Sequence, residues 1–399
     1  MLRIEQVIYS PAVSKTHPEL QKGVKDLSYP QALGELTKTH YTIAISGTHG
    51  KSTTTSMIGL LLANAGLDPT IIVGTKLKEL GDSNCRVGKS KYLVIEADEH
   101  FASFLNYWPK IIVLTTVEAD HLDYYKNLGN IIKAFRKYIT HLSEDGYLVA
   151  NKDDKNIRKI LNPKFEARNP KQIQNTKYKI QNYSLKQTEA MKLEKILQIP
   201  GEHNVSNALA ALTVARILKI PDAISYKSLG KYKGSWRRFK IFDVKIENCK
   251  LKIVSDYGHH PTEIKVTVEA AKQKWPKKKI WLIFQPHQYA RTHFLWKDFV
   301  RVLSNLPIQK LIITDIYDVA GREDKIAKQK VSSEKLVKEI LNTKYKIHDT
   351  LYISTLWETE IYLRKNLRGG EVVMIMGAGD IYNLTVRLTK NFQREKIES

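Results

Sequence analysis

The chain has 399 residues, 42% of them hydrophobic and 26% charged, which excludes the disordered and fibrous classes and allows two or three globular domains. It carries 64 Lys and Arg against 41 Asp and Glu, a formal net charge of +23, but the lysines are scattered along the whole length, as on a solvated surface and unlike a nucleic-acid-binding patch. Its two cysteines give no disulfide framework and no C-x-x-C motif, and no apolar run approaches the ~20 residues of a membrane span, so we expect a cytoplasmic protein with no nucleic-acid and no membrane partner.

Between Tyr41 and His121, short β-rich runs alternate with helical stretches. In chain order these are YTIAIS, TTTSMIGLLLANAG, TIIVG, KYLVIEAD and KIIVLTTV. The alternation predicts an α/β fold with a central, doubly wound and mainly parallel sheet. Ligands of such sheets bind beyond the carboxyl ends of the strands. The motifs SGTHGKS, EADEH and VEADHLD each follow a strand, so we expect all three to face one crevice.

The second half of the chain repeats this rhythm. A helix is expected in GEHNVSNALAALTVARILKI, and after KGSWRRFK strand-like runs such as KIFDVKI, KLKIVSDYG, KIWLIFQPH and EVVMIMGAGD alternate with helices. We therefore predict a central domain over residues 40–234 and a second, smaller, Rossmann-like α/β domain over residues 235–399. The residues before position 40 are too few for a domain of their own.

The stretch ISGTHGKSTTT combines two glycines, a lysine and several hydroxyls at the end of a strand and the start of a helix. Backbone N–H groups and a helix N-terminus meet there, which suits phosphate. Lys51 is expected to reach the β and γ phosphates and Ser52 to offer its hydroxyl to Mg²⁺, although the strict phosphate-loop spacing would need glycine where Ile45 stands. The predicted nucleotide-binding residues of this loop are Gly47, Thr48, His49, Gly50, Lys51, Ser52 and Thr53.

Acidic residues and a histidine follow the next two predicted strands. Glu96, Asp98 and Glu99 come after YLVI, and His121 comes after IIVL. Each acid alone is more often a surface carboxylate or a helix cap. Together, beside a phosphate loop, oxygen ligands and one imidazole are typical of a nucleotide site that holds a divalent metal.

Two later motifs also follow strands. DYGHHPTE contains adjacent histidines, which point in different directions, so at most one is expected to contact a ligand. QPHQYART contains His287 and Arg291, and an arginine in this place suits a carboxylate or a phosphate. Taken singly, each histidine is more often a packing residue.

These motifs resemble those of the Mur ligases. GTHGKSTTT, EADE, VEADHLDYY, HNVSNALAA, RRF, DYGHHPTEI, FQPHQYART and GAGDI occur in the order and spacing of that family, from about Val7 to the C-terminal region. DYGHHPTE and QPH favour the member that adds the first amino acid of the peptidoglycan peptide. The resemblance implies an ATP-binding central domain, a C-terminal domain that closes over it, and a shorter phosphate loop to which Ile45 is no objection.

The resemblance also implies roles for particular residues. Lys51 matches the phosphate-binding lysine, Ser52 a metal-binding hydroxyl, Glu96 a magnesium ligand and His121 a ligand of a second magnesium, so that Lys51, Glu96 and His121 are the expected catalytic residues. For the rest of the nucleotide, Asn204 and Asn207 match residues that hold the adenine, Arg238 one that reaches the phosphates and Asp256 one that contacts the ribose. His287 and Arg291 match the segment that holds the muramoyl end of the substrate.

The implied reaction is ATP-dependent amide formation with Mg²⁺. The lactyl carboxylate of UDP-N-acetylmuramate attacks the γ-phosphate to give an acyl phosphate, and the amine of L-alanine then displaces phosphate. Two metals and Lys51 would neutralise charge on the transferring group, and domain closure would exclude water.

The chain departs from the family pattern in two ways. Residues 1–39 resemble only the end of the glycine-rich N-terminal domain that holds UDP in relatives, so we expect a fragment without the UDP-binding loop, the alternative being a true short form. Gln288 stands where relatives usually have arginine, His100 and Phe101 where a Ser-Asp pair is common, and Thr116 where Thr-Asn is usual. The nucleotide half therefore matches better than the acceptor half.

Other hypotheses remain open from the sequence. One is a related ligase that attaches a recycled peptide to the same sugar, and another is an inactive paralogue that only binds nucleotide. A third, suggested by the charge of +23, is a nucleic-acid-binding protein that has kept the fold. The oligomeric state is not indicated by the sequence.

Overall fold

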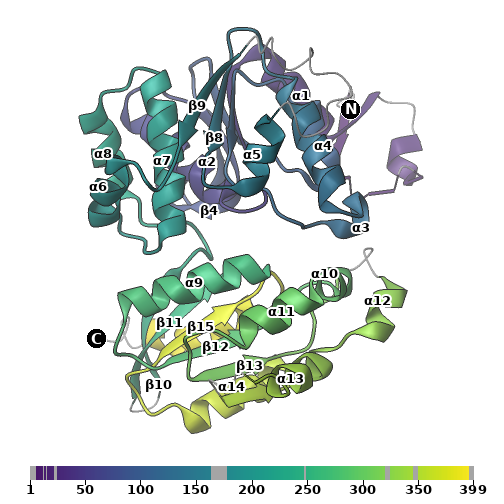
Figure 1. Ribbon diagram of the computed structural model, residues 1–399, viewed down its shortest axis with the longest axis vertical. Helices are drawn as coiled ribbons and strands as arrows, with labels where there is room; N and C mark the ends of the chain where they lie inside the picture. Colours follow the sequence, from purple (N-terminus) through teal and green to yellow (C-terminus); the bar gives the residue numbers. More distant parts are fainter. Residues whose placement is uncertain are drawn as a thin grey trace. The chain divides into compact units, whose positions relative to one another are not determined.

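A computed structural model describes residues 6–11, 13, 14, 16–21, 25–162, 178–246, 249–319, 324–344 and 349–394. The chain forms two compact units (Figure 1). The first unit comprises Met1–Leu197 and Asn204–Tyr232, and the second comprises Gln198–His203 and Lys233–Ser399.

The first unit is built on a seven-stranded sheet with the order β5-β4-β6-β3-β7-β8-β9. Every pair of neighbouring strands is parallel except β4 and β5. The strands are β3 (Tyr41–Ser46), β4 (Thr70–Leu77), β5 (Ser83–Arg86), β6 (Tyr92–Glu96), β7 (Ile111–Leu114), β8 (Tyr147–Asn151) and β9 (Lys179–Tyr183). The predicted central, mainly parallel sheet is confirmed, and β5, β8 and β9 extend it at its two edges.

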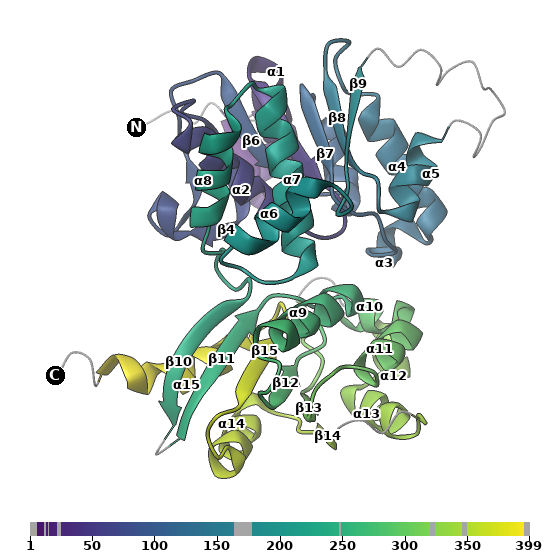
Figure 2. The same cartoon turned by 60° about the vertical axis from the view of Figure 1, so that its left-hand side comes forward.

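Helices cover both faces of this sheet (Figure 2). On one face, α1, α4 and α5 pack against β3, β6, β7 and β8 around a buried aliphatic and aromatic core. On the other face, α2 contacts β4, β6 and α8. The helices are α1 (Tyr29–Thr39), α2 (Lys51–Asn64), α3 (Leu122–Tyr125), α4 (Leu128–Ile139), α5 (Lys155–Leu161), α6 (Thr188–Ile196), α7 (Glu202–Ile217) and α8 (Asp222–Lys231).

Helix α4 illustrates why such segments fold onto the sheet. Its apolar residues recur every three or four positions, at Ile131, Ile132, Phe135, Tyr138 and Ile139, and all five side chains are buried. The helix starts where the side chain of its N-cap asparagine accepts a hydrogen bond from the first turn.

Shorter elements complete the first unit. A parallel pair, β1 (Gln6–Tyr9) and β2 (Lys25–Ser28), forms a separate two-stranded sheet before α1. The 3₁₀ helices among the described residues of this unit are η1 (Pro18–Gln21), between β1 and β2, η2 (Lys78–Leu80) and η3 (His100–Asn106).

The second unit has a six-stranded sheet with the order β10-β11-β15-β12-β13-β14, parallel except for the β10–β11 hairpin. Its strands are β10 (Lys240–Ile246), β11 (Cys249–Asp256), β12 (Ile280–Phe284), β13 (Lys310–Ile313), β14 (Asp349–Tyr352) and β15 (Val372–Met376). The predicted second α/β sheet is therefore present. The loops that follow β11, β12 and β15 carry the motifs DYGHH, QPH and GAGD, and these three strands are neighbours.

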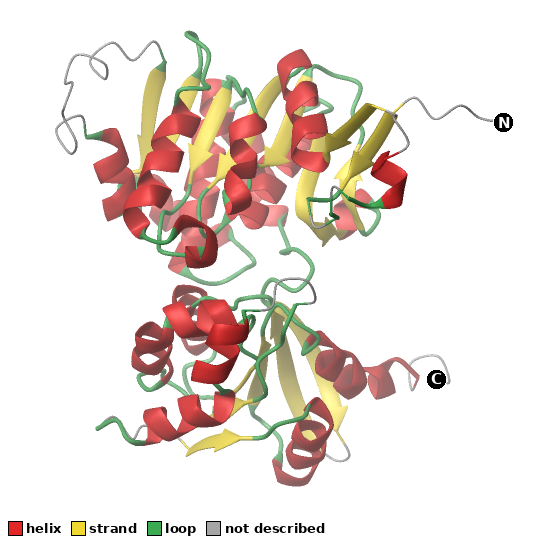
Figure 3. Cartoon of the chain, turned by 90° about the vertical axis from the view of Figure 1, so that its right-hand side faces the viewer, coloured by secondary structure: helices red, strands yellow, loops and turns green. Residues whose placement is uncertain are grey.

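Helices also pack on both sides of this second sheet (Figure 3). A buried core lies between the sheet and α14 and α15, while α11 contacts both α9 and α13. The helices are α9 (Pro261–Lys274), α10 (Tyr289–Phe294), α11 (Trp296–Leu303), α12 (Lys325–Lys330), α13 (Ser333–Leu341), α14 (Leu356–Asn366) and α15 (Tyr382–Arg394). Among the described residues, no helix combines the length and the apolar character that a membrane crossing requires.

Candidate nucleotide and metal site

The loop between β3 and α2 depends on its two glycines. Gly47 has φ +135° and Gly50 has φ +84°, a region that L side chains rarely adopt. A Cβ atom on Gly47 would lie 2.2 Å from Oγ1 of Thr115, and one on Gly50 would lie 2.5 Å from Oδ1 of Asn207. The loop therefore has the glycine-dependent form of a phosphate cradle in spite of Ile45 at the first position of the strict spacing.

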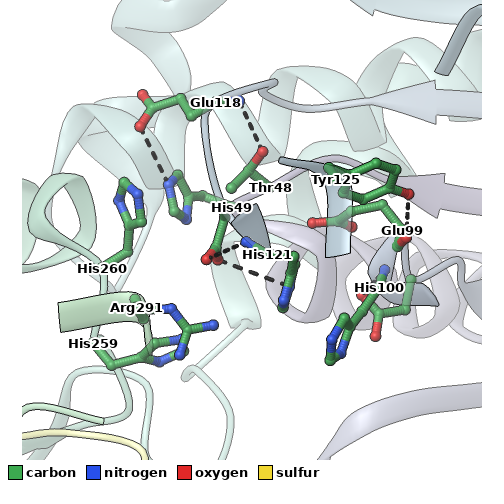
Figure 4. Close-up of polar contacts among 12 residues, drawn as sticks. Thr48, His49, Glu99, His100, Glu118, His121, Tyr125, His259, His260 and Arg291 are labelled. Carbon is green, nitrogen blue, oxygen red and sulfur yellow. Dashed lines mark hydrogen bonds and ion pairs between the residues drawn. The ribbon is translucent and has the colours of Figure 1, made fainter. Parts of the chain in front are cut away.

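This phosphate loop is tied to the segment after β7. The N–H groups of Thr48 and His49 donate to the carbonyl and to the hydroxyl of Thr116, at 2.8 and 2.9 Å. In return, the N–H of Glu118 donates to the hydroxyl of Thr48 at 2.8 Å, and Nε2 of His49 lies 3.5 Å from a carboxylate oxygen of Glu118 (Figure 4). Because these N–H groups are engaged, the donors of the loop that could meet a phosphate are Lys51 and the first N–H groups of α2, which have no acceptor within the helix.

The Lys51 side chain is only 13% exposed, and it is charged. Its Nζ donates to the carbonyl of Gly47 at 2.7 Å and to Oε2 of Glu99 at 2.8 Å, and it lies 3.6 Å from Oδ1 of Asp98. Burial by itself lowers the pKa of Lys51, but the carboxylates of Glu99 and Asp98 outweigh burial and raise that pKa above its ordinary value. The ammonium group is thus positioned at the loop and protonated at neutral pH.

Ser52 and Glu96 meet at the first turn of α2. The Ser52 hydroxyl donates to Oε1 of Glu96 at 3.0 Å, and the other carboxylate oxygen accepts the N–H of Gly74 at 2.7 Å. Adjacent oxygen ligands of an octahedral Mg²⁺ ion lie roughly 3 Å apart, because each is about 2.1 Å from the ion. The two side chains therefore have the spacing and the hard oxygen atoms that Mg²⁺ requires.

His121 belongs to a different group of ligands. It is the N-cap of α3, has φ +51°, and its N–H donates to Oδ1 of Asp120 at 2.8 Å. Among the described residues of this unit, two sets of ligand atoms within 4.8 Å of one another include His121, and Glu96 belongs to neither. The sets are Asp98, Glu99 and His121, and His100, His121 and Asp123.

The two predicted adenine-binding asparagines lie one helical turn apart on α7, and both are buried. Oδ1 of Asn207 accepts a hydrogen bond from the Thr54 hydroxyl at 3.1 Å, and its Nδ2 donates to Oδ1 of Asn204 at 3.5 Å. Helix α7 therefore brings Asn207 against both α2 and Gly50 of the phosphate loop.

In the second unit, Asp256 ends β11 and is buried. Its two oxygens accept the N–H groups of Phe239 and Gly258, both at 2.7 Å. Burial raises the pKa of Asp256, while the guanidinium of Arg238 opposes that shift. Arg238 lies 3.6 Å from a carboxylate oxygen of Glu263 and faces the ring of Tyr257 at 5.2 Å.

His287 and Arg291 follow β12 and contact each other. Nη1 of Arg291 lies 3.3 Å from Nδ1 of His287 and donates to Oε1 of Gln288 at 3.3 Å. The adjacent histidines of DYGHH diverge, because His260 caps α9 whereas the ring of His259 lies 5.5 Å from that of His287. Figure 4 shows His259 next to Arg291.

The sequence did not single out Arg237, which the structure places at the centre of the second unit's loops. Its side chain is buried, donates to the carbonyls of Gly377 and Gly379, and faces the rings of Trp236, Tyr257 and Tyr382. Its place beside Arg238 in the motif RRF is the only signal of Arg237 in the sequence.

Two known protein domains match successive segments of this chain. The Mur ligase middle domain matches residues 45–215, and the domain described as Mur ligase, glutamate ligase domain matches residues 237–379. The UDP-N-acetylmuramate–L-alanine ligase of Clostridium tetani is 38% identical over 95% of this chain and 83% of its own length. The enzyme of the same name from Acetivibrio thermocellus is 36% identical over 97% of this chain and 83% of its own length.

Solved structures share the fold. UDP-N-acetylmuramate-alanine ligase from Thermotoga maritima matches with a TM-score of 0.74 and 22% identity, over 98% of this chain and 86% of that one. A murein peptide ligase from Psychrobacter arcticus matches with a TM-score of 0.66 and 19% identity, over 97% and 85%. With sequence identity of this extent to its curated relatives and both domain matches, the chain belongs to the Mur ligase family.

Proposed function

We propose that this protein is a cytoplasmic, ATP-dependent ligase that joins L-alanine to the lactyl carboxylate of UDP-N-acetylmuramate in peptidoglycan synthesis. The observation that carries the proposal is the 38% identity over 95% of the chain to a ligase of that name. The glycine-dependent loop that positions Lys51 and the Ser52–Glu96 pair supports it independently.

The chemistry needs a phosphoryl donor because a free carboxylate is a poor acyl donor at neutral pH. Transfer of the γ-phosphoryl group of ATP to the lactyl carboxylate gives an acyl phosphate, and the amine of L-alanine then displaces phosphate. Lys51, already charged and held by Gly47 and Glu99, is the group proposed to bind the transferring phosphoryl group. The N-terminus of α2 adds N–H donors at the same place.

We assign the Mg²⁺ ligands to Ser52 and Glu96, with His121 beside a second cation. When bound, Mg²⁺ neutralises negative charge on the phosphate oxygens. Glu96 also accepts the N–H of Gly74, which fixes its carboxylate next to the Ser52 hydroxyl before any ligand binds.

The remaining assignments stay as the sequence predicts them. Asn204 and Asn207 would hold the adenine and Arg238 the nucleotide phosphates. Asp256 keeps lone pairs beyond its two backbone hydrogen bonds, and these suit a ribose hydroxyl. His287 and Arg291 would bind the muramoyl end of the acceptor, where the guanidinium suits a carboxylate.

The test is phosphate release from ATP with each substrate alone and with both. We expect release only when UDP-N-acetylmuramate and an amine acceptor are present together, and we expect L-alanine to be the better acceptor. A faster rate with a tripeptide would instead identify a peptide-recycling ligase. Nucleotide binding without release under any condition would identify an inactive paralogue, and salt-dependent retention on DNA without turnover a nucleic-acid-binding protein.

The role of Lys51 is tested by a charge-matched change. Replacing it alone would leave Glu99 buried beside no cation, so Lys51→Met is combined with Glu99→Gln. The double variant should fold and lose at least about a hundredfold in kcat, because a charge at the phosphoryl group is missing. The control is Lys110→Met, which removes a surface lysine paired with Asp145 at 2.6 Å and should leave kcat unchanged. A double variant as active as the control would remove Lys51 from the mechanism.

A further inference from the structure

The guanidinium of Arg237 is enclosed by aromatic rings in the second unit. The residue is only 6% exposed. Its guanidinium carbon lies 5.4 Å from the ring centroid of Trp236 and 5.1 Å from those of both Tyr257 and Tyr382. Contacts between a cation and the face of an aromatic ring are attractive, and more so when water is excluded. Three rings therefore fix where this side chain lies.

The charge of Arg237 is unfavourable to bury at this place. Among the residues that the structure describes, Arg237 forms no ion pair, whereas its neighbour Arg238 lies 3.6 Å from a carboxylate oxygen of Glu263. Burial lowers the pKa of Arg237. Its Nε is also buried, with no hydrogen-bond partner in the described part of the chain. Because an apolar side chain of similar size would avoid these penalties, packing alone does not explain an arginine here.

The backbone around Arg237 forms a strained turn that is joined to the end of β11. Arg237 and Phe239 have φ of +55° and +49°, which residues other than glycine adopt only where their surroundings impose it. The N–H of Tyr257 donates to the carbonyl of Arg237 at 2.7 Å, and the N–H of Phe239 donates to Oδ2 of Asp256 at 2.7 Å. The turn therefore holds one oxygen of the Asp256 carboxylate.

The side chain of Arg237 extends this connection to the GAGD loop, which follows β15. Its Nη2 donates to the carbonyl of Gly377 and, at 3.3 Å, to that of Gly379. The N–H of Gly377 in turn donates to the carbonyl of Asp256 at 3.1 Å, at the ends of the neighbouring strands β11 and β15 (Figure 1). Arg237, Gly377, Asp256 and Phe239 thus form a closed circuit of hydrogen bonds, in which the Arg237 side chain joins the turn to the loop.

Arg238 is connected to the same circuit through an aromatic ring. The guanidinium carbons of Arg237 and Arg238 lie 5.1 and 5.2 Å from the centroid of the Tyr257 ring. Tyr257 directly follows Asp256, so the position of this ring depends on the end of β11. A change at Arg237 therefore acts on both Asp256 and Arg238.

We propose that Arg237 is a positioning residue for the nucleotide, which holds Asp256 and Arg238 in the orientations that bind the ribose and the phosphates. Groups that are already fixed lose less conformational freedom when a ligand binds, and this raises affinity. The inference rests on the proposed function only in taking Asp256 and Arg238 as nucleotide contacts.

The test is the Kd for ADP with MgCl₂, measured by isothermal titration calorimetry on the whole chain. Arg237→Met fills similar space among the rings but has neither the charge nor the donors, and we expect it to raise the Kd at least about tenfold. The matched control is Arg387→Met in the same unit. Arg387 donates to Glu360 at 2.6 Å, and Glu360 keeps a second partner in Arg364, so this variant should bind ADP like the unaltered chain.

A second variant covers the case in which Arg237→Met does not fold. Arg237→Lys keeps a cation among the rings, but one ammonium group cannot reproduce the planar fork that faces the two carbonyls. It should fold and raise the Kd for ADP at least about threefold.

A double-mutant cycle separates positioning from a general loss of stability. Arg238→Met removes a proposed phosphate contact directly. If Arg237 acts through Arg238, Arg237→Met should raise the Kd by a clearly smaller factor in the Arg238→Met background than in the unaltered chain. The same factor in both backgrounds would overturn the inference. Folded Arg237 variants that bind ADP as tightly as the Arg387→Met control would overturn it as well.

ADP binding and ligation are measured separately, so that the two proposals can fail independently. A chain that forms no amide but whose ADP affinity depends on Arg237 would refute the proposed function and keep the positioning role. A chain that forms the amide and binds ADP equally well without Arg237 would do the reverse.

Discussion

At the scale of single residues, two left-handed glycines of the first unit have different surroundings. Gly50 has φ +84°, and a Cβ atom there would lie 2.5 Å from Oδ1 of Asn207. Gly66, just after α2, has φ +78°, but a Cβ atom there would meet nothing within 4 Å. We predict that Gly66→Ala costs about 1 kcal/mol of unfolding free energy, the price of the backbone strain alone. Gly50→Ala should cost a further 1 kcal/mol or more (about 1–3) from overpacking.

Urea denaturation of both variants checks this prediction. Gly50→Ala should also weaken ATP binding, because Asn207 and the phosphate loop must move apart, whereas Gly66→Ala should bind ATP normally. Equal losses of unfolding free energy in the two variants would mean that the Asn207 side chain moves away from the added methyl group at no energetic cost.

His203 makes the stability of the second unit depend on pH. Burial lowers the pKa of His203 from 6.5 to about 4, and Arg238 acts in the same direction while Glu263 opposes it. In the unfolded chain His203 becomes protonated below about pH 6.5, whereas in the folded chain it stays neutral down to about pH 4. Stability is therefore complete above pH 6.5 and falls as the pH drops toward 4, by at most about 3 kcal/mol.

The comparison that isolates this effect is between the unaltered chain and His203→Gln, each unfolded in urea at pH 7 and at pH 4.5. The variant should lose clearly less stability between the two pH values. Parallel losses would assign the acid sensitivity to other groups.

At the scale of elements, the β8–α5 connection supports the phosphate loop from a distance. Asp154 caps α5 by accepting two N–H groups at 2.8 Å, and its other oxygen accepts the N–H of Val117 at 3.2 Å. Asn156 donates to the carbonyl of Val117 at 2.7 Å. Val117 lies in the segment that is hydrogen-bonded to Thr48 and His49. The N-cap of α5 is therefore connected to the phosphate loop through this segment.

We predict that Asp154→Ala lowers kcat/KM for ATP, by up to about a hundredfold, because the loop is misplaced. It should also cost about 1 kcal/mol of stability for the lost cap. Asp324→Ala is the control, since Asp324 caps α12 through two N–H groups at 3.0 Å. That control should lose the same stability and keep kcat/KM, as measured by urea denaturation and steady-state kinetics. Equal kinetics in the two variants would show that the Val117 contact is dispensable.

Local patterns explain which elements the sequence predicts. The apolar runs of β3, β6, β7 and β15 are buried in the middle of their sheets, and their hydrophobicity identifies them directly. The edge strands β5 and β9 are mostly exposed and polar, so they carry no such signal. The short apolar run of β8, which follows Gly146 and ends at Asn151, carries the same signal as the central strands.

For the candidate site, the sequence likewise predicts some features and misses others. Glycines, Lys51 and hydroxyls at a strand end predict the phosphate loop, because the backbone chemistry is local. The pairing of Lys51 with Glu99 and the stacking of His100 on His121 are not predictable. Both contacts join residues that are far apart in the sequence, and the stack also involves left-handed residues, Phe101 and His121, which the sequence does not reveal.

At the scale of the whole molecule, the net charge of +23 acts on every charged ligand in solution. ATP and UDP-N-acetylmuramate are polyanions, whereas L-alanine is a zwitterion with no net charge at neutral pH. A positive potential raises the concentration of polyanions near the protein, and salt screens it, since the Debye length falls from about 30 Å at 0.01 M to about 10 Å at 0.1 M.

Within this ligase reaction, KM for ATP and for UDP-N-acetylmuramate should therefore rise several-fold between about 0.01 and 0.1 M KCl, while KM for L-alanine stays constant and kcat changes little. L-Alanine serves as the internal control, because it meets the same protein in the same buffer. Steady-state kinetics in which each substrate is varied in turn, at fixed free Mg²⁺, checks this. If all three KM values rose together, salt would be acting on the protein itself. If none rose, the excess of Lys and Arg would concern solubility and not substrate capture.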